Sequence, residues 1–340
     1  MTVDVVLLAG GFGTRMRPLT YTTPKPLLPV LNEPLLVRVL RTFRPIANRA
    51  LLTTFTLREE MRTWADGWNR GGGQPPVTMV EERQPLGTAG AVRNCATMIE
   101  DGRCAVVNAD ILCDLDVTRL ASFHEGAVKR GALATIALVE VPDPSAFGVA
   151  VLEGEKIVRF VEKPPRNEAP SRLINAGVYL FEREVLDTIP KEGPSSLERD
   201  VFPHLAKTGK LAGFPFTGYW SDLGKPSSYL AAHADLLRLE HKPGVVGVGT
   251  LAAEGSRIER TVVGARCRVE RDAAVLDSVV YDDCRVGPCS AVLNSILGRG
   301  VVVGEGALVD NSVVADRVEI PPKSVVKDQR LGLRPGDTYL

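Results

Sequence analysis

The chain has 340 residues, which is more than one ordinary hydrophobic core organises, so its length predicts two domains or one large domain with an appendage. Lysine plus arginine and aspartate plus glutamate both total 41, and this balance argues against a nucleic-acid-binding protein that works through a basic surface. A hydrophobic fraction of 44% excludes wholesale disorder, and no segment approaches the roughly 20 uninterrupted apolar residues of a membrane helix. We therefore expect a cytoplasmic protein with neither a membrane nor nucleic acid as its partner.

The first 240 residues alternate strand and helix patterns. The run Val3–Leu8 is continuously apolar and leads into glycines, which is typical of a strand buried on both faces. Pro34–Ile46 has apolar residues at helical spacing. This βαβα order predicts an α/β fold with a mostly parallel sheet and helices on both faces. Further strands are expected at Leu51–Phe55, Val77–Val80, Ala105–Asn108 and Lys156–Val161, and a further helix over Thr88–Ile99.

After His241 the helical spacing disappears and aliphatic residues recur with a period of 17. Three interlocked registers of this period, each with a small residue or Val two positions earlier, are typical of a triangular parallel β-helix. A β-sandwich with accidental spacing is the alternative. The small slots include Cys267 and Cys284, which we interpret as core thiols and not as ligands. The aliphatic corners are Val263, Val280, Leu297 and Val314; Val269, Val286, Val303 and Ile320; and Val275, Val292 and Val309.

The predicted division of the chain has four parts. They are a catalytic domain over 1–240, a linker over 241–256, a β-helix over 257–325 and a tail over 326–340.

The first strand leads into a glycine-rich turn that also carries two arginines. Gly10, Gly11 and Gly13 would let backbone N–H groups approach a charged ligand without a Cβ atom in the way. Arg15 and Arg17 add charge-assisted donors that suit phosphate oxygens. The segment therefore predicts a phosphate-binding loop.

Two well-known phosphate-binding loops do not match. A dinucleotide-binding turn would read Gly-x-Gly-x-x-Gly and start a helix at once, whereas Pro18 and the segment Thr20–Pro29 prevent a long helix. A P-loop needs Gly-Lys-Ser/Thr, which is absent. Lys25 follows between two prolines that stiffen the segment.

The motifs and their order resemble the sugar-phosphate nucleotidyltransferases, also called nucleotide-sugar pyrophosphorylases, and most of all their mannose-1-phosphate guanylyltransferase branch. The resemblance extends over nearly the whole chain, because a left-handed β-helix is a known appendage of this family. The motifs are Gly-Gly-x-Gly-Thr-Arg-x-x-Pro-Leu-Thr from Gly10, Pro-Lys-Pro-Leu from Pro24, Pro-Leu-Gly-Thr-Ala-Gly from Pro85, Asn-Ala-Asp from Asn108, Val-Glu-Lys-Pro from Val161, Asn-Ala-Gly from Asn175 and Tyr-Trp-Ser-Asp-Leu-Gly from Tyr219.

The resemblance implies a Rossmann-like nucleotidyltransferase domain, followed by the β-helix, that joins a sugar 1-phosphate to a nucleoside triphosphate with Mg²⁺ and releases pyrophosphate. It assigns catalysis to Arg15, Lys25, Asp110 and Asp222, and both aspartates to the metal. It places the sugar phosphate against Gly148, Glu162, Lys163, Asn175 and Gly177. The nucleotide site that we expect comprises Leu8, Ala9, Gly10, Gly11, Gly13, Thr14, Arg15, Lys25, Gln84, Pro85, Gly87, Thr88, Asn108 and Asp110.

Each of these residues also has an ordinary structural explanation. Asp110 follows an apolar run, which puts it at the carboxyl end of a strand, where open α/β sheets bind ligands. However, Asp110 or Asp222 could instead cap a helix or sit in a turn. Glu162 and Lys163 could be a solvated strand end, and Gly148 and Gly177 ordinary turn glycines.

The substrates and the reaction class leave alternatives open. Gln84 could hydrogen-bond a base edge, but an amide pairs with any base, so guanine is followed by thymine, adenine and uracil. The phosphate oxygen is the nucleophile, so a heptose or cyclitol 1-phosphate could replace the sugar 1-phosphate. A non-catalytic regulatory subunit that binds the nucleotide sugar is the alternative of another class. An acyltransferase that works through the β-helix needs a histidine, and residues 257–323 have none.

We expect a homodimer or a higher homo-oligomer. We also expect deletion beyond Lys242 to cost assembly or stability more than chemistry.

Overall fold

The computed structural model describes residues 2–100, 102–332 and 334. The chain forms two compact units that do not follow the sequence order. The first comprises residues 1–11 and 36–220, and the second comprises residues 12–35 and 221–340. The second unit therefore combines most of the glycine-rich loop with the C-terminal part of the chain.

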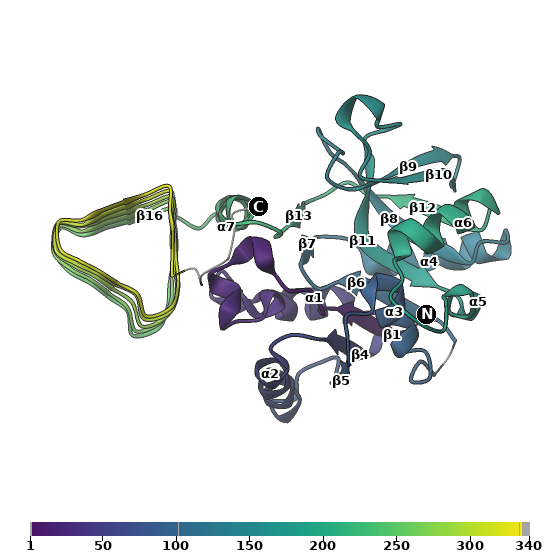
Figure 1. Cartoon of the computed structure of the whole chain (residues 1–340), viewed down its shortest axis with the longest axis horizontal. Coiled ribbons are helices and arrows are strands. Elements are labelled where there is room, and N and C mark those ends of the chain that lie inside the picture. Colours follow the sequence, from purple (N-terminus) through teal and green to yellow (C-terminus); the bar gives the residue numbers. More distant parts are fainter. Residues whose placement is uncertain (1, 101, 333, 335–340) are drawn as a thin grey trace. The chain divides into compact units, whose positions relative to one another are not determined.

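The first unit is built on a nine-stranded sheet (Figure 1). β1, β4, β5 and β6 coincide with the predicted strands to within a few residues. The apolar runs of β1, β4 and β6 are buried on both faces, whereas the edge strand β5 buries only Val77 and Val80. In order across the sheet the strands are β5 (Val77–Glu81), β4 (Ala47–Thr54), β1 (Val3–Leu8), β6 (Cys104–Asn108), β11 (Leu173–Phe181), β8 (Ala134–Glu140), β12 (Leu211–Pro215), β10 (Lys156–Glu162) and β9 (Gly148–Glu153).

The pairing confirms an α/β fold, although parallel pairing does not extend over the whole sheet. β5, β4, β1 and β6 run parallel to one another, and β8 pairs in parallel with β12. β11 pairs antiparallel with both β6 and β8, and β9 and β10 form an antiparallel pair joined by a short turn at Gly154. The sheet is therefore mixed from β11 onward. The tight turn explains the sense of the β9–β10 pair, since such a turn joins strands only in the antiparallel sense.

Helices cover both faces of the sheet. These helices are α1 (Leu35–Phe43), α2 (Arg58–Arg70), α3 (Gly87–Asn94), α4 (Val117–Lys129), α5 (Arg183–Thr188) and α6 (Phe202–Lys207). A further helix, α7 (Pro226–Leu239), belongs to the second unit. α3 ends before Ile99, the expected end, because the chain continues in tighter turns that begin with the bond from Cys95 N to Val92 O. Within the described residues, no helix combines the length and apolar character needed to cross a bilayer.

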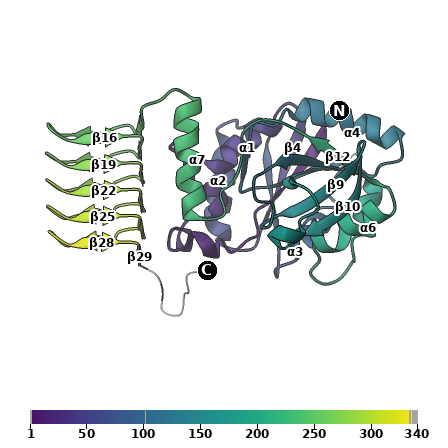
Figure 2. The same cartoon turned by 90° about the horizontal axis from the view of Figure 1, so that it is seen from above.

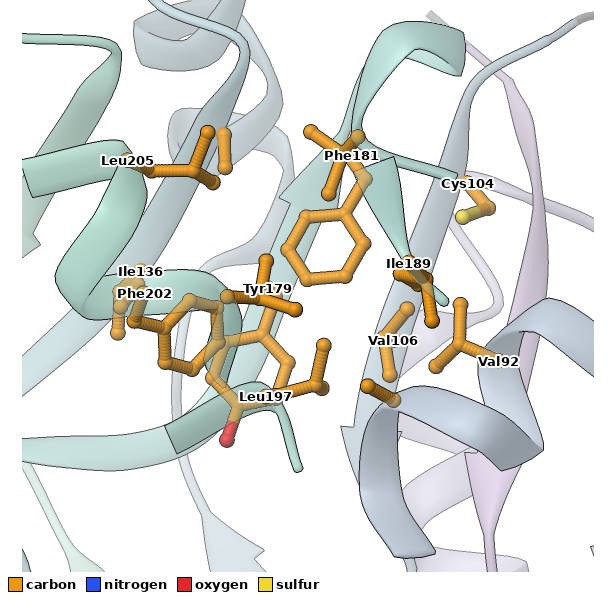
Figure 3. Packing of buried hydrophobic residues seen from close by; sticks show 14 of the residues in the cluster. Val92, Cys104, Val106, Ile136, Tyr179, Phe181, Ile189, Leu197, Phe202 and Leu205 are labelled. Carbon is orange, nitrogen blue, oxygen red and sulfur yellow. The ribbon is translucent and has the colours of Figure 1, made fainter. Parts of the chain in front are cut away.

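The main core lies where α3, α5 and α6 pack on one face of the sheet. Tyr179 and Phe181 of β11 stack on each other and contact Phe202 of α6 (Figure 3). All three aromatic side chains are fully buried, together with Val106 and Ile136 of the neighbouring strands. This packing holds the sheet rigid behind the strand ends that carry the candidate site residues.

In the second unit, the C-terminal part of the chain is a parallel β-helix with three sheets around a triangular cross-section (Figures 1 and 2). The predicted aliphatic corners all point inward and are buried, as are Cys267 and Cys284 in their small slots. The strands repeat from β16 (Arg257–Glu259), β17 (Val262–Val263) and β18 (Arg268–Val269) through β19 (Ala274–Leu276), β20 (Val279–Val280), β21 (Arg285–Val286), β22 (Ala291–Leu293), β23 (Ile296–Leu297), β24 (Val302–Val303), β25 (Leu308–Asp310), β26 (Val313–Val314) and β27 (Glu319–Ile320).

The β-helix is longer at both ends than its sequence period indicates. β14 (Val245–Val246) and β15 (Leu251–Ala252) lie in the expected linker, and each pairs with a strand of the next coil. β28 (Val325–Lys327) crosses into the expected tail, and β29 (Arg330–Leu331) lies within it. The first coil has no coil before it, so its apolar side chains are partly exposed and do not repeat the buried pattern. Of the expected tail, residues 333 and 335–340 lie outside the described residues.

Hydroxyl side chains link successive coils inside the β-helix. Ser295 N donates to Ser278 Oγ at 3.1 Å, and Ser312 N donates to Ser295 Oγ at 3.0 Å. Each of these residues lies 17 positions after its acceptor. The small polar slots in the repeat therefore satisfy backbone N–H groups that would otherwise be buried without a partner.

Candidate active site

The glycine-rich turn begins at the end of β1, where Gly10 lies against Glu82. A Cβ atom on residue 10 would lie 2.6 Å from Glu82 Oε1, so only glycine fits without a shift. Glu82 Oε2 in turn accepts a hydrogen bond from Leu86 N at 3.0 Å. Burial raises the pKa of Glu82, and the bond from Leu86 opposes that rise. This buried carboxylate connects the start of the turn with the Pro-Leu-Gly segment.

The rest of the turn belongs to the second unit and is formed by short 3-10 helices. Gly13 has φ +60°, a left-handed conformation that favours glycine, and its carbonyl accepts a hydrogen bond from Thr20 Oγ1 at 2.8 Å. The first 3-10 helix, Thr14–Met16, buries Met16 and leaves Arg15 exposed. The anchored methionine thus directs the neighbouring arginine outward.

Arg15, Lys25 and Asp222 come together in the second unit, around Gly224. Lys25 Nζ lies 3.9 Å from Asp222 Oδ1, and both side chains are largely buried. A Cβ atom on residue 224 would lie 2.9 Å from both Arg15 Nη2 and Asp222 Oδ2. Two cationic groups therefore lie beside one carboxylate, and the absence of a side chain at Gly224 leaves room for them.

The helix-cap explanation of the two aspartates does not hold. Asp222 ends the short strand β13 (Trp220–Asp222), while Lys225 is the N-cap of α7. Asp110 lies in the turn between β6 and β7 (Ile111–Cys113), so no helix follows it. Leu8 O accepts a hydrogen bond from Ala109 N at 3.1 Å, so the turn with Asp110 is tied to the end of β1. Asp110 therefore sits at the carboxyl end of the parallel strands, as predicted.

A second group of predicted residues meets around β9, β10 and the loop after β10. A Cβ atom on residue 148 would lie 2.4 Å from Phe160 Cζ and 3.0 Å from Glu162 Oε2, so glycine is required there. Lys163 Nζ lies 3.3 Å from Glu162 Oε1 and is more exposed than this partner. Lys163 itself has φ +48°, an unfavourable conformation for a residue with a side chain. Such local strain is more frequent at functional sites than elsewhere.

Asn175 and Gly177 form a bulge in β11. Asn175 Oδ1 accepts from Gly177 N at 2.8 Å, and Asn175 Nδ2 donates to Tyr179 Oη at 2.9 Å. Gly177 has φ +76°, and a Cβ atom there would lie 2.9 Å from Asn108 Nδ2. The bulge thus brings Gly177 next to Asn108 at the end of β6. The two hydrogen bonds of Asn175 use one donor and one acceptor position of its amide, which has two of each.

Structural contacts explain the Pro-Leu-Gly segment in part. A Cβ atom on residue 87 would lie 2.4 Å from Ser195 O, and Gly87 has φ +72°. Thr88 Oγ1 donates to Glu198 Oε2 at 2.8 Å and accepts from Leu197 N at 2.9 Å, so both functions of the hydroxyl are in use. Gln84 and Pro85 are exposed. The side chains of Gln84 and Pro85 are therefore accessible to solvent.

The predicted site residues fall into both units. Asp110, Glu162, Lys163 and Asn175 belong to the first unit, whereas Arg15, Lys25 and Asp222 belong to the second. Within the described residues, no cluster of three or more His, Cys, Asp or Glu side chains suits a metal ion. Any divalent ion would thus rely on fewer protein carboxylates.

Glu82 and Gly224 also belong to this geometry, although neither was predicted as a site residue. Glu82 lies just before the recognised Pro-Leu-Gly segment, and a lone charged residue gives no sign that it is buried. Gly224 ends the recognised motif that starts at Tyr219, but only the contact of a virtual Cβ atom with Arg15 shows why it is needed. Neither contact is visible in the spacing of the sequence.

Two protein-family models match most of this chain. The model of the family described as nucleotidyl transferase matches residues 4–238, and the one described as GMPPB C-terminal domain matches residues 245–333. The chain belongs to the nucleotidyl transferase family. It is thus a nucleotidyltransferase with the Rossmann-like fold and the parallel β-helix that the sequence predicted.

The relatives include enzymes from bacteria and plants. A mannose-1-phosphate guanylyltransferase of Mycobacterium tuberculosis is 35% identical, over 82% of this chain and 80% of that protein. A probable mannose-1-phosphate guanylyltransferase of Oryza sativa is 31% identical, over 82% of this chain and 86% of that protein. These two matches extend the family relationship beyond the catalytic part of the chain.

Solved structures with a similar fold include a putative glucose-1-phosphate thymidylyltransferase from Bacillus anthracis. It has a TM-score of 0.59 and 26% identity, and the match covers 68% of this chain and 94% of that one. HddC from Yersinia pseudotuberculosis has a TM-score of 0.57 and 27% identity, over 68% of this chain and 98% of that one. Both solved chains are thus matched almost completely by about two thirds of this one.

Proposed function

We propose that this nucleotidyltransferase transfers GMP from GTP to mannose 1-phosphate and releases pyrophosphate. The observation that carries the proposal is the meeting of Arg15 and Lys25 beside Asp222. Two cations next to a carboxylate suit a triphosphate whose charge is shared between protein side chains and a divalent ion. The identity of base and sugar rests on the names of the relatives with which the chain is 31–36% identical.

The proposed reaction is an in-line displacement at the α-phosphorus. An oxygen of the sugar phosphate forms the new P–O bond, the bond between the α-phosphorus and the bridging oxygen breaks, and pyrophosphate leaves with the electron pair. Both reactants are polyanions, so catalysis consists of holding them together and neutralising their charge. In this proposal Arg15 and Lys25 bind the triphosphate, while Lys163 binds the phosphate of the acceptor.

Glu162 and Asn175 are proposed to orient the sugar. The Glu162 carboxylate can accept hydrogen bonds from hydroxyl groups, and the Asn175 amide offers both a donor and an acceptor to a vicinal pair. Gly148 and Gly177 keep side chains away from the same region, because Phe160 and Asn108 occupy the space that a Cβ atom would need. The nucleotide is proposed to lie along Gly10–Arg15 and against Gln84 and Pro85.

The chemistry of the donor set suits Mg²⁺. Asp110 and Asp222 are carboxylates, which are the protein ligands that this ion prefers, and Mg²⁺ commonly binds through one or two carboxylates together with substrate phosphates. We propose that these two aspartates hold it. When bound, the ion would neutralise charge that develops on the phosphate oxygens.

The alternatives differ in what they predict for a turnover assay. Another nucleoside triphosphate, or a heptose or cyclitol 1-phosphate, would use the same chemistry and would appear as activity with a different pair. A non-catalytic regulatory subunit would bind a nucleotide sugar without turnover. The presence of all five charged residues, Arg15, Lys25, Asp110, Lys163 and Asp222, favours the enzyme.

The test is a pyrophosphate-release assay with purified full-length protein. GTP and mannose 1-phosphate with Mg²⁺ are compared with the other three nucleoside triphosphates and with several sugar and cyclitol 1-phosphates. We expect the highest kcat/KM for the first pair. Turnover with a different pair would correct the substrates alone, whereas binding of a nucleotide sugar without any turnover would support the regulatory subunit.

We further propose a homodimer or higher homo-oligomer in the cytoplasm, where nucleoside triphosphates and sugar phosphates are found. Support for self-association comes from the first coil of the β-helix, where Val246, Val248 and Leu251 are 51%, 89% and 63% exposed. Large apolar side chains grouped in this way favour an interface. Light scattering of the full chain and of Val248→Asp would test this, since a monomeric wild-type protein would contradict it.

A further inference from the structure

The end of the β-helix contacts the loop that carries Arg15. Arg330 lies in β29, the last strand of the stack (Figure 2). Its Nη1 atom donates hydrogen bonds to Arg15 O at 2.9 Å and to Arg17 O at 3.0 Å. One guanidinium nitrogen thus holds two carbonyl groups of the predicted phosphate-binding loop, from a position more than 300 residues later in the chain.

Neighbouring contacts reinforce this attachment. Thr22 Oγ1 donates to Asp316 Oδ2 at 2.8 Å, and the Arg334 guanidinium lies 4.5 Å from the centre of the Tyr21 ring. Arg334 N also donates to Tyr21 Oη at 3.0 Å. All of these groups belong to the second compact unit. The loop is therefore attached to the β-helix at three successive places between Arg15 and Thr22.

The hydrogen bonds from Arg330 act on the backbone segment that sets the direction of the Arg15 side chain. The carbonyls of Arg15 and Arg17 flank Met16, whose side chain is fully buried. With Met16 held from inside and both carbonyls held from outside, the backbone of residue 15 has little freedom to turn. The Arg15 guanidinium then remains near Asp222, where Gly224 leaves room for it.

We infer that Arg330 is a positioning residue, which orders the loop 14–17 and thereby aims Arg15 at the triphosphate. The kinetic part of this inference rests on the proposed function, whereas the ordering of the loop does not. Arg330 donates to backbone carbonyls of the loop, so we expect its effect on turnover to pass through Arg15. A misplacement of about 1 Å in such a positioning group can cost on the order of a hundredfold in rate.

Two substitutions at Arg330 separate positioning from general stability. Arg330→Met removes the donor, and Arg330→Lys keeps a shorter cationic donor that can restore part of the contact. Arg317→Met is the matched control, because Arg317 is an exposed arginine of the preceding coil. All four proteins, including the wild type, are studied as full-length chains, and their thermal unfolding is recorded.

Hydrogen exchange of peptides covering residues 12–21 measures the order of the loop directly. We expect faster exchange there in Arg330→Met, a smaller increase in Arg330→Lys and no change in Arg317→Met, with peptides from 274–297 unchanged in all. Unchanged exchange of the loop in Arg330→Met would overturn the inference. Uniformly faster exchange across the whole β-helix would do the same, because it would mean a structural role only.

Kinetics then test the consequence for catalysis. We expect kcat/KM for the nucleotide to fall about tenfold or more in Arg330→Met, with partial rescue by lysine, while KM for the sugar 1-phosphate stays within about twofold. If a more mobile loop leaves both substrates unaffected, Arg330 does not position Arg15. If the wild type itself turns over no substrate pair, the proposed function fails, and the exchange result still decides the ordering role.

Discussion

The ammonium of Lys25 lies 3.9 Å from the carboxylate of Asp222, although the two residues are almost 200 positions apart in the chain. This pair gives Asp222 a cationic neighbour in the absence of substrate. A carboxylate in such a position is also a ready ligand for a divalent ion once phosphate groups neutralise the lysine. The contact therefore joins the two kinds of charge that a nucleotidyltransferase needs.

Asp222→Asn and Asp110→Asn should each lower kcat by about a hundredfold or more, because each removes at nearly constant volume a charge that we propose to bind the metal ion. Thermal unfolding should change little, since neither aspartate caps a helix. Steady-state kinetics over a range of Mg²⁺ concentrations checks this. A control is Asp187→Asn, at an exposed position of α5. Near-normal rates in either variant would remove that aspartate from the metal site.

Gly148→Ala should weaken binding of the sugar phosphate and destabilise the fold. The new methyl group would meet Phe160 Cζ at 2.4 Å, an overlap that costs about 1–3 kcal/mol and pushes Phe160 or Glu162 aside. We expect a higher KM for the sugar 1-phosphate with little change for the nucleotide. Gly67→Ala in α2 is the control, because open space surrounds that position and alanine favours a helix. Equal KM values for both variants would contradict the role of Gly148.

The stability of the protein should fall between pH 6.5 and about 4 because of His124. Burial, and secondarily the nearby Arg103, lower the pKa of His124 to about 4 in the folded chain. The Glu182 carboxylate lies 3.3 Å from its Nε2 atom but is already paired with Arg103 at 2.7 Å. Below pH 6.5 the His124 side chain binds a proton in the unfolded chain but not in the folded chain, so the free energy of unfolding decreases as the pH falls.

The pKa difference corresponds to a maximal loss of roughly 3 kcal/mol, which is reached once the pH is below the folded value. Denaturant unfolding at several pH values measures it. His124→Asn should make the curve flatter in this range, even if the variant is less stable at pH 7. His204→Asn, at an exposed position of α6, is the matched control. Parallel curves for wild type and His124→Asn would contradict the assignment.

Ser295→Ala should destabilise the β-helix by about 1–3 kcal/mol. The substitution removes the acceptor of the buried Ser312 N–H group and leaves that donor without its partner. Ser324→Ala is a suitable control, since its hydroxyl is exposed and bonds locally to Pro321 O. Chemical denaturation of both variants would show the difference. A loss no larger in Ser295→Ala than in the control would mean that water replaces the missing acceptor.

The hydrogen bonds of Arg330 change the role that we expect for the β-helix. The sequence led us to expect that deletion beyond Lys242 costs assembly or stability more than chemistry. The bonds from Arg330 to the loop of Arg15 now predict that such a deletion also slows turnover. The division of the chain at about residue 240 stays a prediction, and the loop 12–35 groups with the C-terminal part in the structure.

The sequence by itself determined the α/β class, the β-helix and the family, because these depend on local periodicity and on short motifs. The period of 17 predicted the buried corners from Val263 to Ile320, since each of these coils repeats the same environment. It failed at the first coil and at the last strands, where one neighbouring coil is missing and the pattern weakens. The antiparallel strand β11 was likewise not predicted from the sequence, because strand direction depends on partners distant in the chain.

Only the tertiary structure decided which charges meet. The approach of Lys25 to Asp222, the burial of Glu82 against Gly10 and the hold of Arg330 on the loop all join residues far apart in sequence. Local sequence patterns do not predict such contacts, because an arginine or glutamate gives the same pattern whether it is exposed to solvent or contacts a distant residue. Motifs therefore predicted the kinds of residues at the site, and folding selected their neighbours.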